Sequence, residues 1–152
     1  MDMIGFIGMG NMGTAMLKGA KRTFDGSRII FHRKSVDKMK KLAEEEKVNY
    51  AMSNSEVVEK SKYIILAIKP QMFIDEINDS LDNDKVIISL APGFTITQLK
   101  EKLKAGRIVR SMPNTPAMIG EGMTGVCFDE NEFDKAIESF NHRDRRFGKN
   151  PK

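Results

Sequence analysis

The sequence of 152 residues is long enough for one domain with a hydrophobic core and short for two. Its net charge of +4 does not indicate a nucleic-acid partner, because residues 141–152 contain five basic and one acidic side chain and leave 20 of each sign in residues 1–140. Because Cys127 is the single cysteine, an internal disulfide is excluded. No stretch approaches the ~20 apolar residues that a membrane span needs, and no His/Cys spacing indicates a metal site. These exclusions favour a cytoplasmic protein with no nucleic-acid, membrane or metal partner, in which Cys127 is a small buried side chain.

The N-terminal segment has the pattern of a dinucleotide-binding unit. A short apolar run at residues 3–7 leads into three glycines, and small or apolar residues at helical spacing follow them: Met12, Ala15, Met16, Gly19 and Ala20. We expect Gly8 to permit a tight turn, Gly10 to let the main chain approach a pyrophosphate, and Gly13 to let the helix pack closely. The start of this helix favours an anion. The alternative is a glycine-rich turn that binds no ligand.

Strands and helices alternate along the rest of the chain. Strands are predicted at residues 28–32, 48–51, 63–68, 86–90, 107–112 and 124–128, and helices from residues 35, 53, 73, 95 and 133. We expect Ser35 to cap its helix. Ser53 with Glu56, and Thr95 with Gln98, have the spacing of capping boxes.

This alternation predicts a single α/β domain over residues 1–140, built on a doubly wound, mostly parallel, Rossmann-like sheet. In such sheets ligands bind outside the carboxyl ends of the strands. The irregular segments of the sequence follow predicted strands at such ends: residues 8–13, 32–35, 69–71, 91–93 and 113–116. The sequence therefore predicts a cofactor site along this edge. Residues 141–152 are charged and lack periodicity, so we expect a basic tail that is disordered or aberrant.

The residues after the second predicted strand distinguish between the two common dinucleotides. An NAD-binding unit usually places Asp or Glu ~20 residues beyond the glycines, where the carboxylate accepts from the ribose 2′-hydroxyl. Here the segment reads His32-Arg33-Lys34-Ser35, and the first carboxylate, Asp37, falls inside the predicted helix. Two cations and a hydroxyl suit a 2′-phosphate, so we predict NADP(H), with NAD(H) as the second choice. The alternative is that Arg33 and Lys34 are merely solvated charges.

Three later segments carry a more specific pattern. They are Ala67-Ile68-Lys69-Pro70-Gln71, Ser89-Leu90-Ala91-Pro92-Gly93-Phe94-Thr95-Ile96 and Arg110-Ser111-Met112-Pro113-Asn114-Thr115-Pro116-Ala117, after which Gly120-Glu121-Gly122-Met123-Thr124-Gly125 follows. In this order and spacing the chain resembles pyrroline-5-carboxylate reductase over about residues 3–130. The resemblance implies a Rossmann-like, NAD(P)H-dependent oxidoreductase of proline biosynthesis. Its activity would be hydride transfer to the C=N bond of 1-pyrroline-5-carboxylate, which gives L-proline.

The resemblance also implies roles for individual residues. The main chain at Gly8, Gly10, Asn11 and Met12 would hold the pyrophosphate, His32, Arg33 and Lys34 the 2′-phosphate, Asn54 the adenosine half, Ala67, Ile68, Lys69 and Pro70 the ribose and nicotinamide, and Pro113 and Asn114 would flank the nicotinamide beside the substrate. Prolines such as Pro70 and Pro113 stiffen loops that hold a planar ring for hydride transfer. Lys69 is a candidate for a catalytic residue, through a substrate carboxylate, and is otherwise a loop cation.

Members of that family continue into a helical second domain, which makes the protein a homo-oligomer and completes the substrate site. Residues 141–152 do not continue the family pattern and are similar to a truncated, frame-shifted or artificial end. We therefore expect NADP(H) binding with weak or absent turnover of the small-molecule substrate. Two other functions stay open. One is a related oxidoreductase acting on another imine, a hydroxyacid or a deazaflavin, and the other is a stand-alone NADP-binding module, sensor or scaffold.

Overall fold

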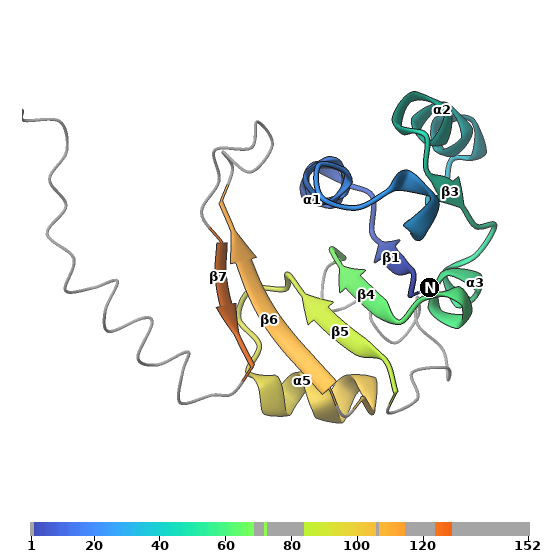
Figure 1. Cartoon of the computed structure of the whole chain (residues 1–152). Helices are drawn as coiled ribbons and strands as arrows, with labels where there is room; N and C mark the ends of the chain where they lie inside the picture. The colour runs from blue at the N-terminus through green and yellow to red at the C-terminus, as the bar shows by residue number, and fades with distance from the viewer. Residues whose placement is uncertain (1, 69–71, 73–83, 106, 115–123, 129–152) are drawn as a thin grey trace, which may run out of the picture.

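The apolar runs of the sequence form one seven-stranded sheet in the computed structural model, which describes residues 2–68, 72, 84–105, 107–114 and 124–128. The strands are β1 (Ile4–Ile7), β2 (Ile29–His32), β3 (Asn49–Tyr50), β4 (Tyr63–Leu66), β5 (Val86–Ser89), β6 (Arg107–Pro113) and β7 (Thr124–Cys127). The helices are α1 (Asn11–Lys21), the short 3-10 helix η1 (Gly26–Arg28), α2 (Val36–Glu46), α3 (Asn54–Lys60) and α5 (Ile96–Leu103). The strand order is β3-β2-β1-β4-β5-β6-β7 (Figure 1).

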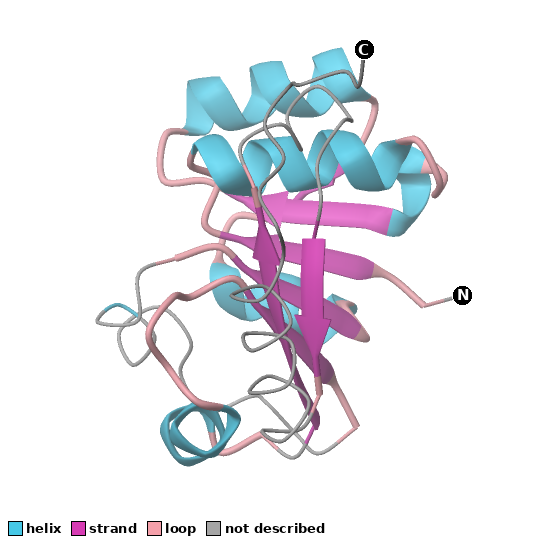
Figure 2. Ribbon diagram, turned by 90° about the vertical axis from the view of Figure 1, so that its left-hand side faces the viewer, coloured by secondary structure: helices cyan, strands magenta, loops and turns pink. Residues whose placement is uncertain are grey.

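Strands β1 to β6 run parallel, and β7 is antiparallel to β6. Helices α1 and α2 lie on one face of the sheet, and α3 and α5 lie on the other (Figures 1 and 2). Central strands covered on both faces must be apolar throughout, which is why all four residues of β1 are buried. The predicted doubly wound, mostly parallel, Rossmann-like sheet is confirmed.

Each face of the sheet has its own hydrophobic core. The core under α1 and α2 includes Phe6, Leu17, Phe31, Met39 and Leu42. The core under α3 and α5 includes Val57, Ile64, Ile87, Leu99 and Ile108. Cys127 belongs to this second core and is buried, as its apolar surroundings in the sequence predict.

The buried face of α1 differs from the predicted one. Leu17 is fully buried, together with Gly13 and Ala15, whereas Gly19 is exposed. Gly13 and Leu17 are four residues apart and therefore lie on one side of the helix. Of the predicted face, Ala15 is buried, and Met16 and Ala20 are partly buried against the core, as predicted. The prediction was wrong at Gly19, which is exposed, and it left out Leu17.

The helix caps are as predicted at α5 and differ from prediction at α2 and α3. At α5 the capping box is complete, since Thr95 Oγ1 accepts from the Gln98 N–H at 3.1 Å and Gln98 Oε1 accepts from the Thr95 N–H at 3.0 Å. At α3 the hydroxyl of Ser53 accepts from the Glu56 N–H, but the Glu56 carboxylate accepts from the N–H of Met52 instead of that of Ser53. This is half a capping box. Ser35 is the N-cap residue of α2, yet its side chain makes no capping hydrogen bond.

Some predicted elements lie outside the described residues. They are the helices over residues 73–81 and 133–140 and the tail at residues 141–152. The division of the chain at residue 140 therefore stays a prediction. Among the described elements, β3 and β4 are each two residues shorter than predicted. β3 covers only Asn49–Tyr50, and β4 ends at Leu66, so that Ala67 and Ile68 belong to the following loop.

The N-cap residues Thr95 of α5 and Ser35 of α2 give a matched test of helix capping. Replacing Thr95 by alanine removes a capping hydrogen bond of α5 and is expected to lower the free energy of unfolding by about 1 kcal/mol. Replacing Ser35 by alanine removes no capping bond and is expected to cost less than about 0.5 kcal/mol. Urea denaturation of the two variants measures this difference, and equal losses would contradict the described caps.

Candidate functional site

The parallel register places the ends of several strands along one edge of the sheet. Ile7 pairs with His32 on one side and with Leu66 on the other. Leu66 pairs with Ser89, and Ser89 pairs with Arg110. The segments that leave these residues therefore emerge along a common edge, as the sequence predicts for a ligand site.

The glycine turn after β1 packs closely against the segment that follows β4. Gly8 has a φ of +92°, which side chains other than glycine rarely adopt. A Cβ on Gly8 would lie 2.5 Å from Cγ2 of Ile68 and 2.7 Å from the carbonyl oxygen of Ala67. A Cβ on Gly13 would strike the carbonyl oxygen of Gly8. Both glycines are thus required by the fold, and the turn brings Gly8, Ala67 and Ile68 together as predicted.

Gly10 differs from these two glycines, because no steric contact among the described residues requires it. It is the N-cap residue of α1 with a φ of −77°, and a Cβ at this position would meet no atom of the described residues within 4 Å. The first N–H groups of a helix have no acceptor within the helix, and α1 has neither a side-chain cap nor an acidic residue in its first turn. The positive end of the α1 dipole, at Asn11 and Met12, is thus suited to an anion that approaches the main chain of Gly10.

A pocket of about 330 Å³ opens beside this turn, between the ends of β1 and β2. Its walls are formed by Gly8, Met9, His32, Arg33, Lys34, Ser35, Lys38, Asn54, Ile68 and Met72. Three of these residues, Arg33, Lys34 and Lys38, are cations, and none is an acid. A pocket with this charge favours a multiply charged anion, and a phosphate ester is the common biological one.

The imidazole of His32 is held in place by the main chain. Its Nδ1 lies 3.0 Å from the carbonyl oxygen of Ala51. Since a carbonyl oxygen can only accept, Nδ1 carries the hydrogen and donates it. Nε2 is therefore the nitrogen left to a ligand.

Glu56, the nearby acid, is already engaged. Its pKa is lowered from 4.5 first by the hydrogen bond from Lys60, then by the Met52 N–H, and also by the charge of His32. Glu56 is not among the described residues that line the pocket, and its carboxylate is already paired with Lys60.

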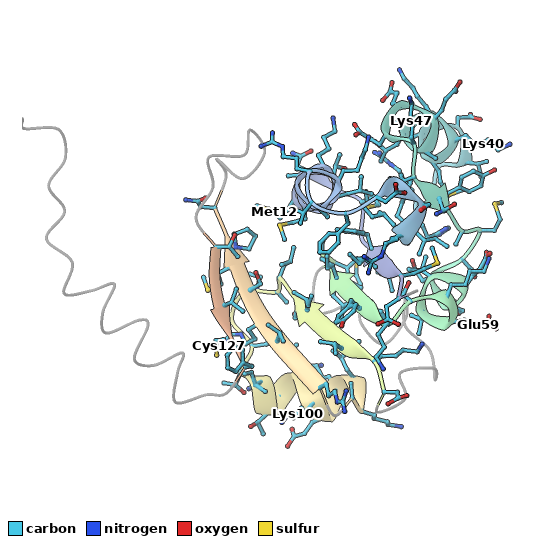
Figure 3. All side chains as sticks on the ribbon, viewed as in Figure 1. Met12, Lys40, Lys47, Glu59, Lys100 and Cys127 are labelled. Carbon is cyan, nitrogen blue, oxygen red and sulfur yellow. The ribbon has the colours of Figure 1, made fainter. Side chains whose placement is uncertain are left out.

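The structure gathers most of the predicted site residues, though not in one pocket. Gly8, His32, Arg33, Lys34, Asn54 and Ile68 line it. Gly10, Asn11, Met12 and Ala67 belong to the adjoining turn and strand end, and in the view of Figure 3 Met12 lies between α1 and the end of β6. Pro113 ends β6 and Asn114 follows it, at the same edge of the sheet. Lys69 and Pro70 lie outside the described residues.

Sequence reasoning missed three residues of the pocket wall: Met9, Lys38 and Met72. The sequence places Lys38 three residues after the N-cap Ser35, in the first turn of α2, but whether it reaches the pocket depends on the direction of that helix. Met9 and Met72 carry no such signal, because flexible apolar side chains fill gaps of many kinds.

Within the described part of the chain, no helix is both long and apolar enough to cross a membrane. No group of three or more His, Cys, Asp or Glu side chains in those same residues is placed to hold a metal ion.

The strand order, the glycine turn and the pocket at the carboxyl edge define a Rossmann-type α/β domain. The chain belongs to the family described as NADP oxidoreductase, coenzyme F420-dependent, whose model matches residues 3–93. It is also similar to enzymes named pyrroline-5-carboxylate reductase, which confirms the resemblance predicted from the sequence. The Escherichia coli (strain K12) enzyme is 41% identical over 129 residues, which cover 81% of this chain and 48% of that enzyme.

Solved structures of similarly named proteins share the fold. The pyrroline-5-carboxylate reductase of Coxiella burnetii superposes with a TM-score of 0.72 at 31% identity, over 91% of this chain and 54% of that one. Pyrroline carboxylate reductase of Plasmodium falciparum, solved with NADP bound, superposes with a TM-score of 0.71 at 28% identity, over 90% of this chain and 52% of that one. The chain thus spans about half the length of the relatives it matches.

Proposed function

We propose that this chain binds NADP(H) along the carboxyl edge of its parallel sheet. The proposal is supported by two features that lie next to each other at that edge. The N-terminus of α1 is open to an anion beside Gly10, and the described residues that line the adjoining pocket include three cations and no acid. A dinucleotide with a 2′-phosphate has anionic groups at both of these places.

The proposed roles of the residues are those that the family resemblance implies. The main chain of Gly8, Gly10, Asn11 and Met12 binds the pyrophosphate, His32, Arg33 and Lys34 bind the 2′-phosphate, Asn54 contacts the adenosine half, Ala67, Ile68, Lys69 and Pro70 line the path of the ribose and nicotinamide, and Pro113 and Asn114 flank the nicotinamide. NAD(H) is expected to bind more weakly, because it lacks the 2′-phosphate that these cations are proposed to bind.

For the reaction, we propose the reduction of 1-pyrroline-5-carboxylate to L-proline. The 41% identity to a reductase of that name supports this substrate. When bound, NADPH supplies the hydride for the C=N bond, and the residues of this chain position the nicotinamide and exclude water. Lys69 is proposed to attract the substrate carboxylate. Because the chain spans about half of its relatives, this activity is proposed for the whole cytoplasmic protein, and weak turnover is expected from residues 1–152 alone.

A second candidate is favoured by the description of the family, which names coenzyme F420. In that case NADP(H) is bound in the same way and exchanges hydride with F420 instead of an imine. Assays with 1-pyrroline-5-carboxylate and with F420, each with NADPH, distinguish the two candidates by which substrate consumes NADPH.

Replacing Gly10 by alanine tests cofactor binding separately from stability. Its Cβ would meet no atom within 4 Å in the described part of the chain, so we expect the free energy of unfolding to change by less than about 1 kcal/mol. The same Cβ blocks the approach of a pyrophosphate to the main chain, so we expect NADPH affinity to fall at least about tenfold, or ~1.4 kcal/mol.

Gly19 provides the matched control. It lies inside α1, and its Cβ too would meet no atom of the described residues within 4 Å, but it is exposed and away from the turn. Gly19→Ala is expected to bind NADPH like the wild type in isothermal titration calorimetry. Wild-type affinity in Gly10→Ala would contradict the proposed pyrophosphate site.

A further inference from the structure

The pocket wall contains a cation that belongs to α2 and not to the loop after β2. Lys38 is the third residue of this helix, and it lines the pocket together with Arg33, Lys34 and Ser35. Side chains on a helix lean toward its N-terminus, so a long side chain at position 38 reaches back over the turn that precedes α2. Lys38 therefore lines the same pocket as the two loop cations, Arg33 and Lys34.

Lys38 makes few favourable interactions with the described residues of the fold. A cation in the first turn of a helix is disfavoured by the helix dipole, which favours Asp37 there instead. No ion pair of Lys38 is found among the described residues, whereas Lys18 and Lys21 pair with Glu46 at 3.3 and 3.7 Å. A lysine at this position becomes favourable when an anion occupies the pocket.

We infer that Lys38 is a specificity-determining residue that binds the 2′-phosphate of NADP(H) together with Arg33 and Lys34. This inference rests on the proposed function and goes beyond it by assigning a third cation to the phosphate. A phosphate monoester carries a charge of about −2 near neutral pH and three acceptor oxygens. Arg33 and Lys34 approach from the loop and Lys38 from the helix, so together they can contact more than one side of such a group.

The test compares two nucleotides that differ only in the 2′-phosphate, adenosine 2′,5′-bisphosphate and adenosine 5′-monophosphate. Lys38→Gln is expected to weaken binding of the bisphosphate roughly five- to tenfold and that of the monophosphate less than twofold. Lys38→Arg keeps the charge and is expected to restore most of the bisphosphate affinity. Isothermal titration calorimetry of the full chain supplies the dissociation constants, and urea unfolding midpoints confirm that the variants are folded.

The matched control is Lys40→Gln on the same helix. Lys40 is also exposed, but it faces a separate groove beside Tyr50 instead of the nucleotide pocket (Figure 3). Its replacement removes the same charge and is expected to change neither affinity by more than twofold. Equal losses in Lys38→Gln and Lys40→Gln would show a general charge effect and would overturn the inference.

The other outcomes separate the two proposals. If the wild type prefers the bisphosphate and Lys38→Gln keeps that preference, the role of Lys38 is wrong and the proposed cofactor site stands. If the wild type binds neither the bisphosphate nor NADPH, the proposed function fails and the inference fails with it.

Discussion

Replacing Gly13 by alanine is expected to lower the free energy of unfolding by about 3 kcal/mol, because the new methyl group would overlap main-chain atoms. Its Cβ would strike the carbonyl oxygen of Gly8 and lie 3.2 Å from the Cβ of Ala67. Neither of these atoms can rotate away, since Gly8 is held at a φ of +92° and the N–H of Ala67 donates to the carbonyl of Ile7 at 2.8 Å. Relief of the overlap therefore requires α1 to move away from the sheet.

Urea denaturation of Gly13→Ala and Gly19→Ala measures this effect with the same chemical change in the same helix. Gly19→Ala is expected to raise stability by up to about 1 kcal/mol, since alanine is the better helix former at an exposed position. A loss below about 1 kcal/mol in Gly13→Ala would show that α1 does not pack on the turn as described.

Replacing Arg33 and Lys34 together by glutamine is expected to remove most of the preference for NADPH over NADH. Each charged hydrogen bond to a phosphate contributes about 1.5–3 kcal/mol when formed in a protein, and the exposure of Lys34 places its contribution at the lower end. The two losses together amount to about 3 kcal/mol, or roughly 100-fold in the dissociation constant of NADPH. NADH lacks the 2′-phosphate, so its affinity is expected to change less than about threefold.

A double variant with the same change of charge is the control. Lys40 and Lys100 lie on α2 and α5, outside the nucleotide pocket, and their joint replacement by glutamine is expected to leave both affinities unchanged (Figure 3). Fluorescence titration of the wild type and of both double variants with NADPH and with NADH gives the dissociation constants to compare. An unchanged NADPH preference in Arg33→Gln/Lys34→Gln would refute the assignment of these residues to the 2′-phosphate.

The fold could be predicted well from the sequence because its strands are buried on both faces. Fully apolar segments such as residues 64–66 have few alternatives to a central parallel strand, and the glycines after β1 mark the turn that follows it. The N-cap of α5 was also predictable, since Thr95 and Gln98 interact locally within one helical turn.

The features that sequence reasoning missed depend on contacts between elements. Whether Leu17 or Gly19 faces the core is decided by how α1 sits on the sheet, and small residues carry little information about that orientation. Glu56 forms only half a capping box because Lys60 and the Met52 N–H compete for its carboxylate. Lys38 joins the pocket only through the direction in which α2 leaves the end of β2.

The most direct measurement is a titration of the isotope-labelled chain with NADPH, followed by the backbone amide signals in NMR. We expect the signals of Asn11, Met12, Arg33, Lys34 and Ile68 to shift together with one dissociation constant, because one ligand would lie across the ends of β1, β2 and β4. NADH is expected to shift Asn11 and Met12 while affecting Arg33 and Lys34 much less. Shifts confined to the separate groove at Asn49 and Tyr50, or no shift at Asn11 and Met12, would contradict a cofactor held at the carboxyl edge of this sheet.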